Sequence, residues 1–309
     1  MPEGPEKLDY QEWVQRMKQK QDQHPEAQKK AQGGAAPQAK SEQPRADARG
    51  KQQGKDTGHT EQESRVKLPK WPEDQWSTPV AILRSALFGV IKPGRRQQLK
   101  DKELAAWPGV TVRYTGERLD QADLDVFEEA LQYYQCSDEC LGSTVQISSK
   151  AFLKSIGRNT GKKDREWLRA SFLRMVASAV QIKVGDLEYV GSLVHAFVYD
   201  ERTGRFNLQI NPDLAKLFQN GHTRIDKKKR LALGSRQLAK AVYSFVQTHI
   251  ADQNSPLTVS YDRMYQLFGQ NYNRKRNFYP QLRQTLQELT EWEYITSWKD
   301  KGQNIEIIK

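Results

Sequence analysis

Apolar residues recur every three or four positions in two long stretches of the chain, which predicts two amphipathic helices. In the segment 121–135, the apolar positions share one helical face: Leu124, Phe127, Ala130, Leu131 and Tyr134. In the segment 162–179, a second apolar face is built from Leu168, Phe172, Met175, Val176 and Ala179. Between them, 148–157 predicts a short helix with Ser148 or Ser149 as its N-cap.

Alternating and β-branched runs follow these helices and predict strands. Three such runs are VQIKV, EYVGSLVHAFVYDE and RFNLQINP, joined by glycine-containing turns at Gly185 and Gly204. Another run, VTVRYTGERL, precedes the first helix. Three helices followed by a β-hairpin or small sheet are the element order of a winged helix-turn-helix domain.

The same order recurs in the last third of the chain. Helices are predicted from Ser235, from Ser260 and over the stretch RNFYPQLRQTLQELTEWEYI, and two strands surround Lys301 and Gly302. We therefore predict an α+β fold of tandem winged helix-turn-helix domains with a disordered N-terminal tail. The expected parts are a tail over 1–64, an extended arm over 65–108, a first domain over 109–220 and a second over 221–309, with a linker at about 221–233.

Composition separates the tail from the rest. Residues 1–64 hold 11 basic and 11 acidic residues, so the net charge of +11 belongs to residues 65–309, with 38 basic and 27 acidic residues. The tail has few large apolar residues and is expected to stay disordered, because it cannot bury enough surface to offset the entropy of ordering. Without a membrane-length apolar run or a signal-like N-terminus, the protein is expected in the cytoplasm.

Cationic and amide side chains are crowded at the start of the last helix. They lie outside its apolar stripe, so we expect them to be exposed. Such an end suits the third helix of a helix-turn-helix, whose N-terminal residues meet base edges in the major groove. Arginine can pair with guanine, and asparagine or glutamine with adenine. Pro280 is comfortable only in a first helical turn, so we expect the helix to begin near Asn277. The predicted DNA-binding positions are Arg274, Lys275, Arg276, Asn277, Gln281, Arg283 and Gln284.

Two further basic groups are candidates for phosphate contacts. Around the third helix of the first domain the candidates are Lys162, Lys163, Arg165 and Arg169, to which Arg158 can be added. They include fewer amides, so phosphate contact is favoured over base reading. In the linker run RIDKKKRLALG, Lys228 and Arg230 are predicted to cross the phosphate backbone. Ordinary solvated helix faces remain an alternative for each group.

No motif points to an enzyme. GRNTGKKD has three residues where a phosphate loop needs four, and offers Lys163 in place of the magnesium-binding hydroxyl. The five histidines are scattered singly, and Cys136 and Cys140 lack the further ligands of a zinc site, so both are expected as free thiols. We therefore expect no catalytic residues, no metal and no cofactor.

Four segments resemble the TrfA family of plasmid replication initiators: RSALF (84–88), VRYTGERLDQADLDVFEEALQY (112–133), SLVHAF (192–197) and the closing order of helix, basic helix and wing. The resemblance spans about 68–309. It implies two winged helices that bind directly repeated origin sites, called iterons, help to open the origin, and recruit the host replicative helicase with the host initiator protein. It also implies a monomer–dimer equilibrium.

Two questions remain open at this point. Some family members carry a sliding-clamp peptide of the QLxLF kind before the arm, where this chain reads VKLPKWP, which leaves recruitment of the clamp open. The alternative function is a winged-helix transcriptional repressor, which would bind a palindromic operator as a two-fold dimer.

Overall fold

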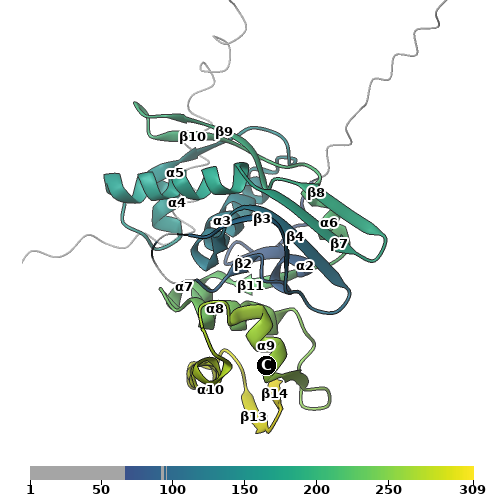
Figure 1. Cartoon of the computed structure of the whole chain (residues 1–309). Helices are drawn as coiled ribbons and strands as arrows, with labels where there is room; N and C mark the ends of the chain where they lie inside the picture. Colours follow the sequence, from purple (N-terminus) through teal and green to yellow (C-terminus); the bar gives the residue numbers. More distant parts are fainter. Residues whose placement is uncertain (1–66, 92–93, 95) are drawn as a thin grey trace, which may run out of the picture. The chain divides into compact units, whose positions relative to one another are not determined.

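The structure is a computed structural model that describes residues 67–91, 94 and 96–309. The tail predicted over 1–64 lies outside the described residues. The described chain is a mixed α and β fold in which helices alternate with five small sheets (Figure 1). In this part of the chain, no helix combines the length and the apolar character needed to cross a membrane.

The first unit, residues 121–210, contains three helices and a three-stranded sheet. Its elements are α3 (Gln121–Ser137), β6 (Val145–Ser148), α4 (Ser149–Ser155), α5 (Lys162–Val176), β9 (Val194–Asp200) and β10 (Arg205–Ile210). The last strand lies in the middle of the sheet, in the order β6-β10-β9, and both of its pairings are antiparallel. Helix α5 packs against β9 (Figure 1).

The second unit, residues 237–308, repeats this order of elements. It consists of α8 (Gln237–Gln247), β12 (Leu257–Ser260), α9 (Tyr261–Phe268), α10 (Lys275–Glu291), β13 (Ser297–Lys301) and β14 (Asn304–Ile308). The sheet order β12-β14-β13 again places the last strand in the middle. The two units therefore share one topology, although their sequences show no detailed repeat.

Local sequence explains the helix starts in both units. The Ser148 hydroxyl accepts a hydrogen bond from the backbone N–H of Ala151, and Ser260 does the same for Arg263, so each serine satisfies a donor that the first helical turn leaves unpaired. The start of α10 was predicted two residues late: the helix begins at Lys275, and Pro280 lies in its second turn. Proline has no N–H, so it cannot bond to the Arg276 carbonyl one turn earlier.

The first unit contains an insertion between α5 and its terminal hairpin. Strands β7 (Ala179–Val184) and β8 (Leu187–Gly191) leave the unit and extend a sheet begun by β3 (Gln98–Leu104) and β4 (Val110–Glu117), in the order β3-β4-β7-β8. Residues 98–104, predicted as part of an extended arm, are therefore a strand of a regular sheet. Short parallel strands β2 (Phe88–Gly89) and β5 (Leu119–Asp120) lie nearby in sequence.

A two-stranded ribbon replaces the linker predicted at about 221–233. Strand β1 (Gln75–Pro79) pairs with β11 (His222–Asp226), and α2 (Val80–Leu83), α6 (Leu214–Gln219) and α7 (Lys227–Ala232) flank the ribbon in sequence. The ribbon is anchored by Trp76, which is fully buried and donates its indole N–H to Glu129 over 2.9 Å. Trp71 stacks on Phe218 of α6, so the arm is packed on the body.

A buried cluster of charges joins the two units. Three carboxylates of α3 meet three cations of α7 and α8: Asp125, Glu128 and Glu129 face Lys227, Arg230 and Lys240. Equal numbers of opposite charges allow these groups to leave water together, because buried charges are tolerated when they are paired.

Candidate nucleic-acid interface

Helix α10 has one apolar face and one exposed, cationic and amide-bearing face. Phe278, Leu282, Leu286 and Leu289 are fully buried against the second unit's core. The exposed set comprises Arg274, Lys275, Arg276, Asn277, Gln281, Arg283 and Gln284, all of the residues predicted for this helix. The structure thus brings these side chains together along one helix, mostly within its first three turns.

The cations of α10 fall into two groups. Arg274 and Arg276 are exposed, and neither has an ion-pair partner in the described part of the chain. Lys275 and Arg283 are held by carboxylates of neighbouring elements. The Lys275 ammonium lies 2.8 Å from Asp262 of α9, and the Arg283 Nε lies 2.9 Å from Asp300 of β13.

The two carboxylates have further partners that fix them. Asp262 also accepts a hydrogen bond from the Tyr279 hydroxyl, and Asp300 accepts one from Tyr261 over 2.8 Å. The pKa of Asp262 is lowered chiefly by the hydrogen bond from Lys275, and that of Asp300 chiefly by the one from Tyr261. Both groups therefore stay ionised beside α10.

The β13–β14 hairpin adds further exposed polar groups beside α10. Lys299 and Lys301 are exposed, and the turn is made by Gly302 with a φ of +76°, a conformation that favours glycine. The Gly302 N–H donates to Asp300 over 2.9 Å, so the same carboxylate that holds Arg283 also shapes the hairpin turn.

In the first unit, the predicted cations surround the start of α5, but most have local partners. Arg165 donates to the Thr160 carbonyl over 3.0 Å, Arg169 lies 3.5 Å from Glu201, and Lys162 lies 3.9 Å from Glu166. Lys163 is exposed and has no ion-pair partner among the described residues. Arg158 lies over the Trp167 ring, 3.5 Å from its centroid. The first basic surface is therefore more neutralised by its own acids than the second.

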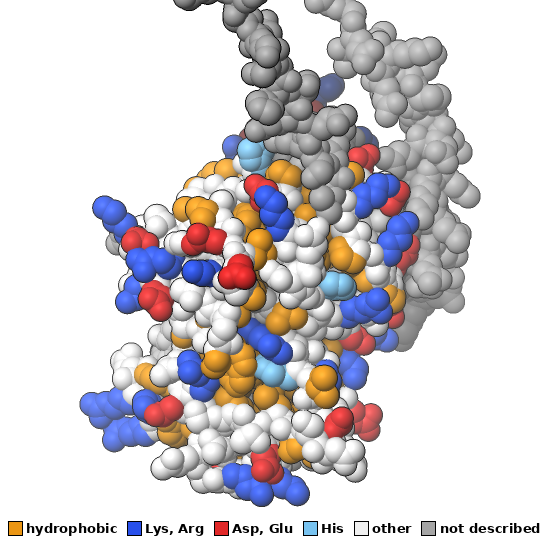
Figure 2. Space-filling model, turned by 90° about the vertical axis from the view of Figure 1, so that its right-hand side faces the viewer, with side chains coloured by type: hydrophobic (Ala, Val, Ile, Leu, Met, Phe, Trp, Pro, Cys, Tyr) orange, Lys and Arg blue, Asp and Glu red, His pale blue; other side chains and the backbone are white. Residues whose placement is uncertain are grey.

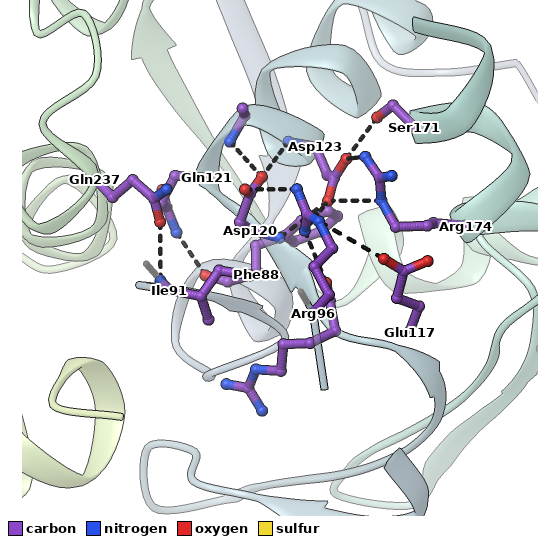
Figure 3. A network of polar contacts seen from close by, with 12 residues as sticks. Phe88, Ile91, Arg96, Glu117, Asp120, Gln121, Asp123, Ser171, Arg174 and Gln237 are labelled. Carbon is purple, nitrogen blue, oxygen red and sulfur yellow. Dashed lines mark hydrogen bonds and ion pairs between the residues drawn. The ribbon is translucent and has the colours of Figure 1, made fainter. Parts of the chain in front are cut away.

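A buried carboxylate positions α5. Asp123 is fully buried at the start of α3 and accepts hydrogen bonds from Ser171 (2.6 Å) and Arg174 (2.5 Å) of α5 (Figure 3). The Arg96 guanidinium pairs with two carboxylates: it lies 2.9 Å from that of Asp123 and 2.6 Å from that of Asp120. Ser171 lies on the buried face of α5, so these hydrogen bonds add to the apolar packing that holds α5 against α3.

The two cations of the linker run that were predicted to contact phosphates differ in exposure. Lys228 is exposed and lies on α7, but Arg230 is fully buried. The Arg230 guanidinium lies 2.9 Å from Asp125 and 3.1 Å from Glu128, and donates to Ser244 over 2.7 Å. The assignment of Arg230 to DNA contact is therefore wrong, since the side chain is enclosed by the cluster that joins the units.

A groove of about 740 Å³ is lined by residues of both units. From the first unit, its wall includes Gly157 and Arg158 of the turn between α4 and α5. From the second unit, Gln281, Gln284 and Glu288 of α10 also line it. Two of the amides predicted to read bases thus face a space shared with the first unit.

Basic side chains do not form one continuous patch on the face that Figure 2 shows. On the face seen in Figure 2, Lys and Arg side chains form separate groups with acidic and hydrophobic side chains among them. The acidic residues that matter beside α10 were not singled out in the sequence. A carboxylate in the first turn of a helix or at a hairpin turn is common, and only the fold shows that Asp262 and Asp300 meet Lys275 and Arg283.

The described residues include no group of three or more histidine, cysteine, aspartate or glutamate side chains arranged to hold a metal ion. Cys136 and Cys140 are half-buried and are not joined in a disulfide.

No protein-family model and no curated protein matches this chain. Among solved structures, domains 2 and 3 of RctB are similar with 13% identical residues and a TM-score of 0.49, over 74% of this chain and 97% of that one. The Pi initiator protein in complex with iteron DNA is similar with 13% identity and a TM-score of 0.45, over 60% of this chain and 91% of that one. Likenesses at this level do not identify a function, which has to rest on this chain's own residues.

Proposed function

We propose that the two units are tandem winged helix-turn-helix domains and that the protein binds duplex DNA as a plasmid replication initiator. The observation that carries DNA binding is the exposed end of α10. There Arg274 and Arg276, which have no ion-pair partner among the described residues, stand beside Asn277, and the opposite side of the same helix is buried in the core. In the third helix of a winged helix-turn-helix, this end enters the major groove.

The two units contribute differently to binding. Around α10, forked guanidinium and amide groups are mixed, which is the chemistry that pairs with base edges. Around α5, Lys162 and Arg169 lie near acids, Arg165 donates to a backbone carbonyl, and Lys163 has no ion-pair partner among the described residues, a chemistry that suits phosphate contact. The second unit therefore supplies most of the sequence reading, and the first unit mainly positions the duplex.

The shared topology with unlike surfaces favours an asymmetric site. Two different helices in one chain present different side chains to successive grooves, so the two halves of the bound sequence differ. Directly repeated sites of this kind are what an iteron-binding initiator requires. The TrfA-like segments support this assignment, and with it recruitment of the host replicative helicase and host initiator protein, and a monomer–dimer equilibrium.

A transcriptional repressor is the rival proposal, because winged helices serve both functions. A repressor that binds as a two-fold dimer selects a palindrome. We propose further that the protein has no enzymatic activity, since its charged clusters are engaged in holding the fold or face outward from a helix.

Selection of binding sites from random duplex DNA at near-physiological salt separates these possibilities. A non-palindromic site that spans about two helical turns, with unlike halves, is the expected result. A palindrome would favour the repressor. Binding without any enriched sequence would mean that the basic surface contacts phosphates alone.

A further inference from the structure

Arg283 is held by one edge of its guanidinium, while the other edge is free. Its Nε donates to the Tyr261 hydroxyl over 2.8 Å and to Asp300 over 2.9 Å. In the part of the chain that the structure describes, neither of its two Nη nitrogens has a hydrogen-bond partner. The side chain remains 46% exposed, so the free edge can reach a ligand.

The free edge has the geometry that guanine requires. A guanidinium offers parallel N–H groups in a planar fork, and guanine presents O6 and N7 side by side in the major groove. A mobile arginine would lose side-chain entropy on binding, whereas one already held at Nε loses less. Holding the side chain at Nε therefore favours two-point contact with a base over a single contact with a phosphate.

The residue that holds Arg283 is itself fixed from three sides. One Asp300 carboxylate oxygen accepts from Arg283 and Tyr261, and the other accepts from the Gly302 N–H of the hairpin turn. The Arg283 guanidinium also lies over the Tyr261 ring, 5.0 Å from its centroid. Three elements, α9, α10 and the β13–β14 hairpin, thus converge on one carboxylate.

Asp262 of α9 supplies a contrast, because it holds a different cation of α10. It pairs with Lys275, whose ammonium is a compact charge on a flexible stem and carries no planar fork. Removing Asp262 also frees a cation of α10, and it removes none of the hydrogen-bond partners of Arg283. Its substitution therefore controls for the loss of one negative charge near DNA.

We propose that Asp300 is a positioning residue for specificity: from the hairpin, it orients Arg283 of α10 to read one guanine through both Nη groups. This inference rests on the proposed DNA binding of the second unit. The wing thereby contributes to base reading through a neighbouring side chain.

The test begins with the site selected by the wild-type protein and measures binding to duplexes in which each G·C pair is replaced by A·T. We expect one G·C pair to be preferred by about 5- to 150-fold, the range for a bidentate arginine–guanine contact. Asp300→Ala and Arg283→Lys should each remove most of that preference and leave preferences at other positions unchanged. The double variant should lose no more than either single variant.

Conservative variants and a matched control guard against a purely structural effect. Asp300→Asn retains an oxygen acceptor for Nε and should keep most of the preference, while Tyr261→Phe removes one Nε partner and should weaken it. Asp262→Ala should leave the preference intact. Melting temperatures identify any variant that fails to fold. If Asp300→Ala is such a variant, the guanine preferences of Asp300→Asn and Tyr261→Phe test the inference in its place.

Three results would overturn the inference. Asp300→Ala could weaken binding to all duplexes equally, which would make the carboxylate a fold contact only. Asp262→Ala could lower the guanine preference as much as Asp300→Ala does. Finally, the wild-type protein could select no sequence at all, a result that rejects sequence reading by the second unit and the inference with it.

Discussion

The Arg230 Nε lies 2.9 Å from a carboxylate oxygen of Asp125, although 105 residues of chain separate them. Arg230 is on α7, just before the second unit, and Asp125 is on α3 of the first unit. Asp125 also pairs with Lys240 of α8, so the cluster joins the two units. Arg230 and Asp125 are both buried, and a fully enclosed guanidinium is stable only while its acceptors are in place.

Arg230→Ala should destabilise the protein strongly. Removing one partner leaves Asp125 and Glu128 buried with less compensation, a change that typically costs about 3 to 5 kcal/mol. Urea unfolding followed by tryptophan fluorescence measures the free energy of unfolding. Lys228→Ala on the same helix is the control and should change it by about 0.5 kcal/mol or less, because that side chain is exposed. Equal effects of the two substitutions would contradict the role assigned to the cluster.

Stability should depend on the ionisation of Glu128. Burial raises the pKa of this carboxyl from its ordinary 4.5 to about 7, with Arg230 opposing the shift and Asp125 adding to it. Lys240 and the Thr78 hydroxyl also face the group and favour its charged form. The folded state therefore holds a proton that the unfolded state releases between about pH 4.5 and pH 7.

The sign follows from that difference in bound protons. The contribution of Glu128 to stability is fully present below about pH 4.5 and is lost as the pH rises through about 7, by at most about 3 kcal/mol. Glu128→Gln cannot titrate, so its free energy of unfolding should improve relative to wild type over the same interval. Parallel pH profiles for the two proteins would show that Glu128 does not titrate in this range.

Arg276→Ala and Gln281→Ala should relax base preference at particular positions of the bound site. Both side chains are exposed on α10, and a good arginine or glutamine contact with a base discriminates by about 1 to 3 kcal/mol. Binding constants for a panel of single-base variants of the selected site supply the measurement. A uniform loss over the whole panel would mean that these residues touch only phosphate.

A chain that starts at Val66 should bind DNA as tightly as the full chain. The 65 removed N-terminal residues hold 12 basic and 11 acidic residues and contribute a net charge of only +1, and electrostatic attraction supplies most non-specific affinity. Titration of a labelled duplex at two salt concentrations compares both the affinity and its salt dependence. Much weaker binding by the shortened chain would assign the tail a part in DNA contact.

Purified protein should neither hydrolyse ATP nor nick DNA. The stretch Gly157–Asp164 lacks the spacing and the hydroxyl of a phosphate loop, and Arg158 within it is engaged with Trp167 and Asp164. Phosphate release and cleavage of a supercoiled plasmid that carries the selected site are the assays. A metal-dependent nick that maps to that site would establish an enzymatic function.

Periodicity and capping chemistry predicted the local parts of the fold well. The apolar faces of α3 and α10 are buried, and Ser148 and Ser260 cap the helices for which they were proposed. The pattern failed where partners are distant in sequence. Arg230 sits in a run of cations that looks solvated, and nothing local shows that three carboxylates of α3 surround that run.

The same limit applies to the candidate interface. The sequence located the cations and amides of α10, because their positions follow from the helical period. It did not separate the unpaired Arg276 from the restrained Arg283, since that difference depends on a hairpin about 17 residues further on. The strand at 98–104 was missed for a related reason: its register is set by β4, and its own residues are mostly exposed.

The ribbon of β1 and β11 sets a distance that DNA would have to match. Helix α3 of the first unit packs on β1 and α8 of the second on β11, and the strands are paired from Gln75 opposite Asp226 to Pro79 opposite His222. Adding one base pair to B-DNA turns the next groove by about 34°. If the protein is an initiator of the proposed kind, the base sequence of each half-site can therefore differ from one origin to another. The number of base pairs between the two halves stays constant, because the protein fixes it.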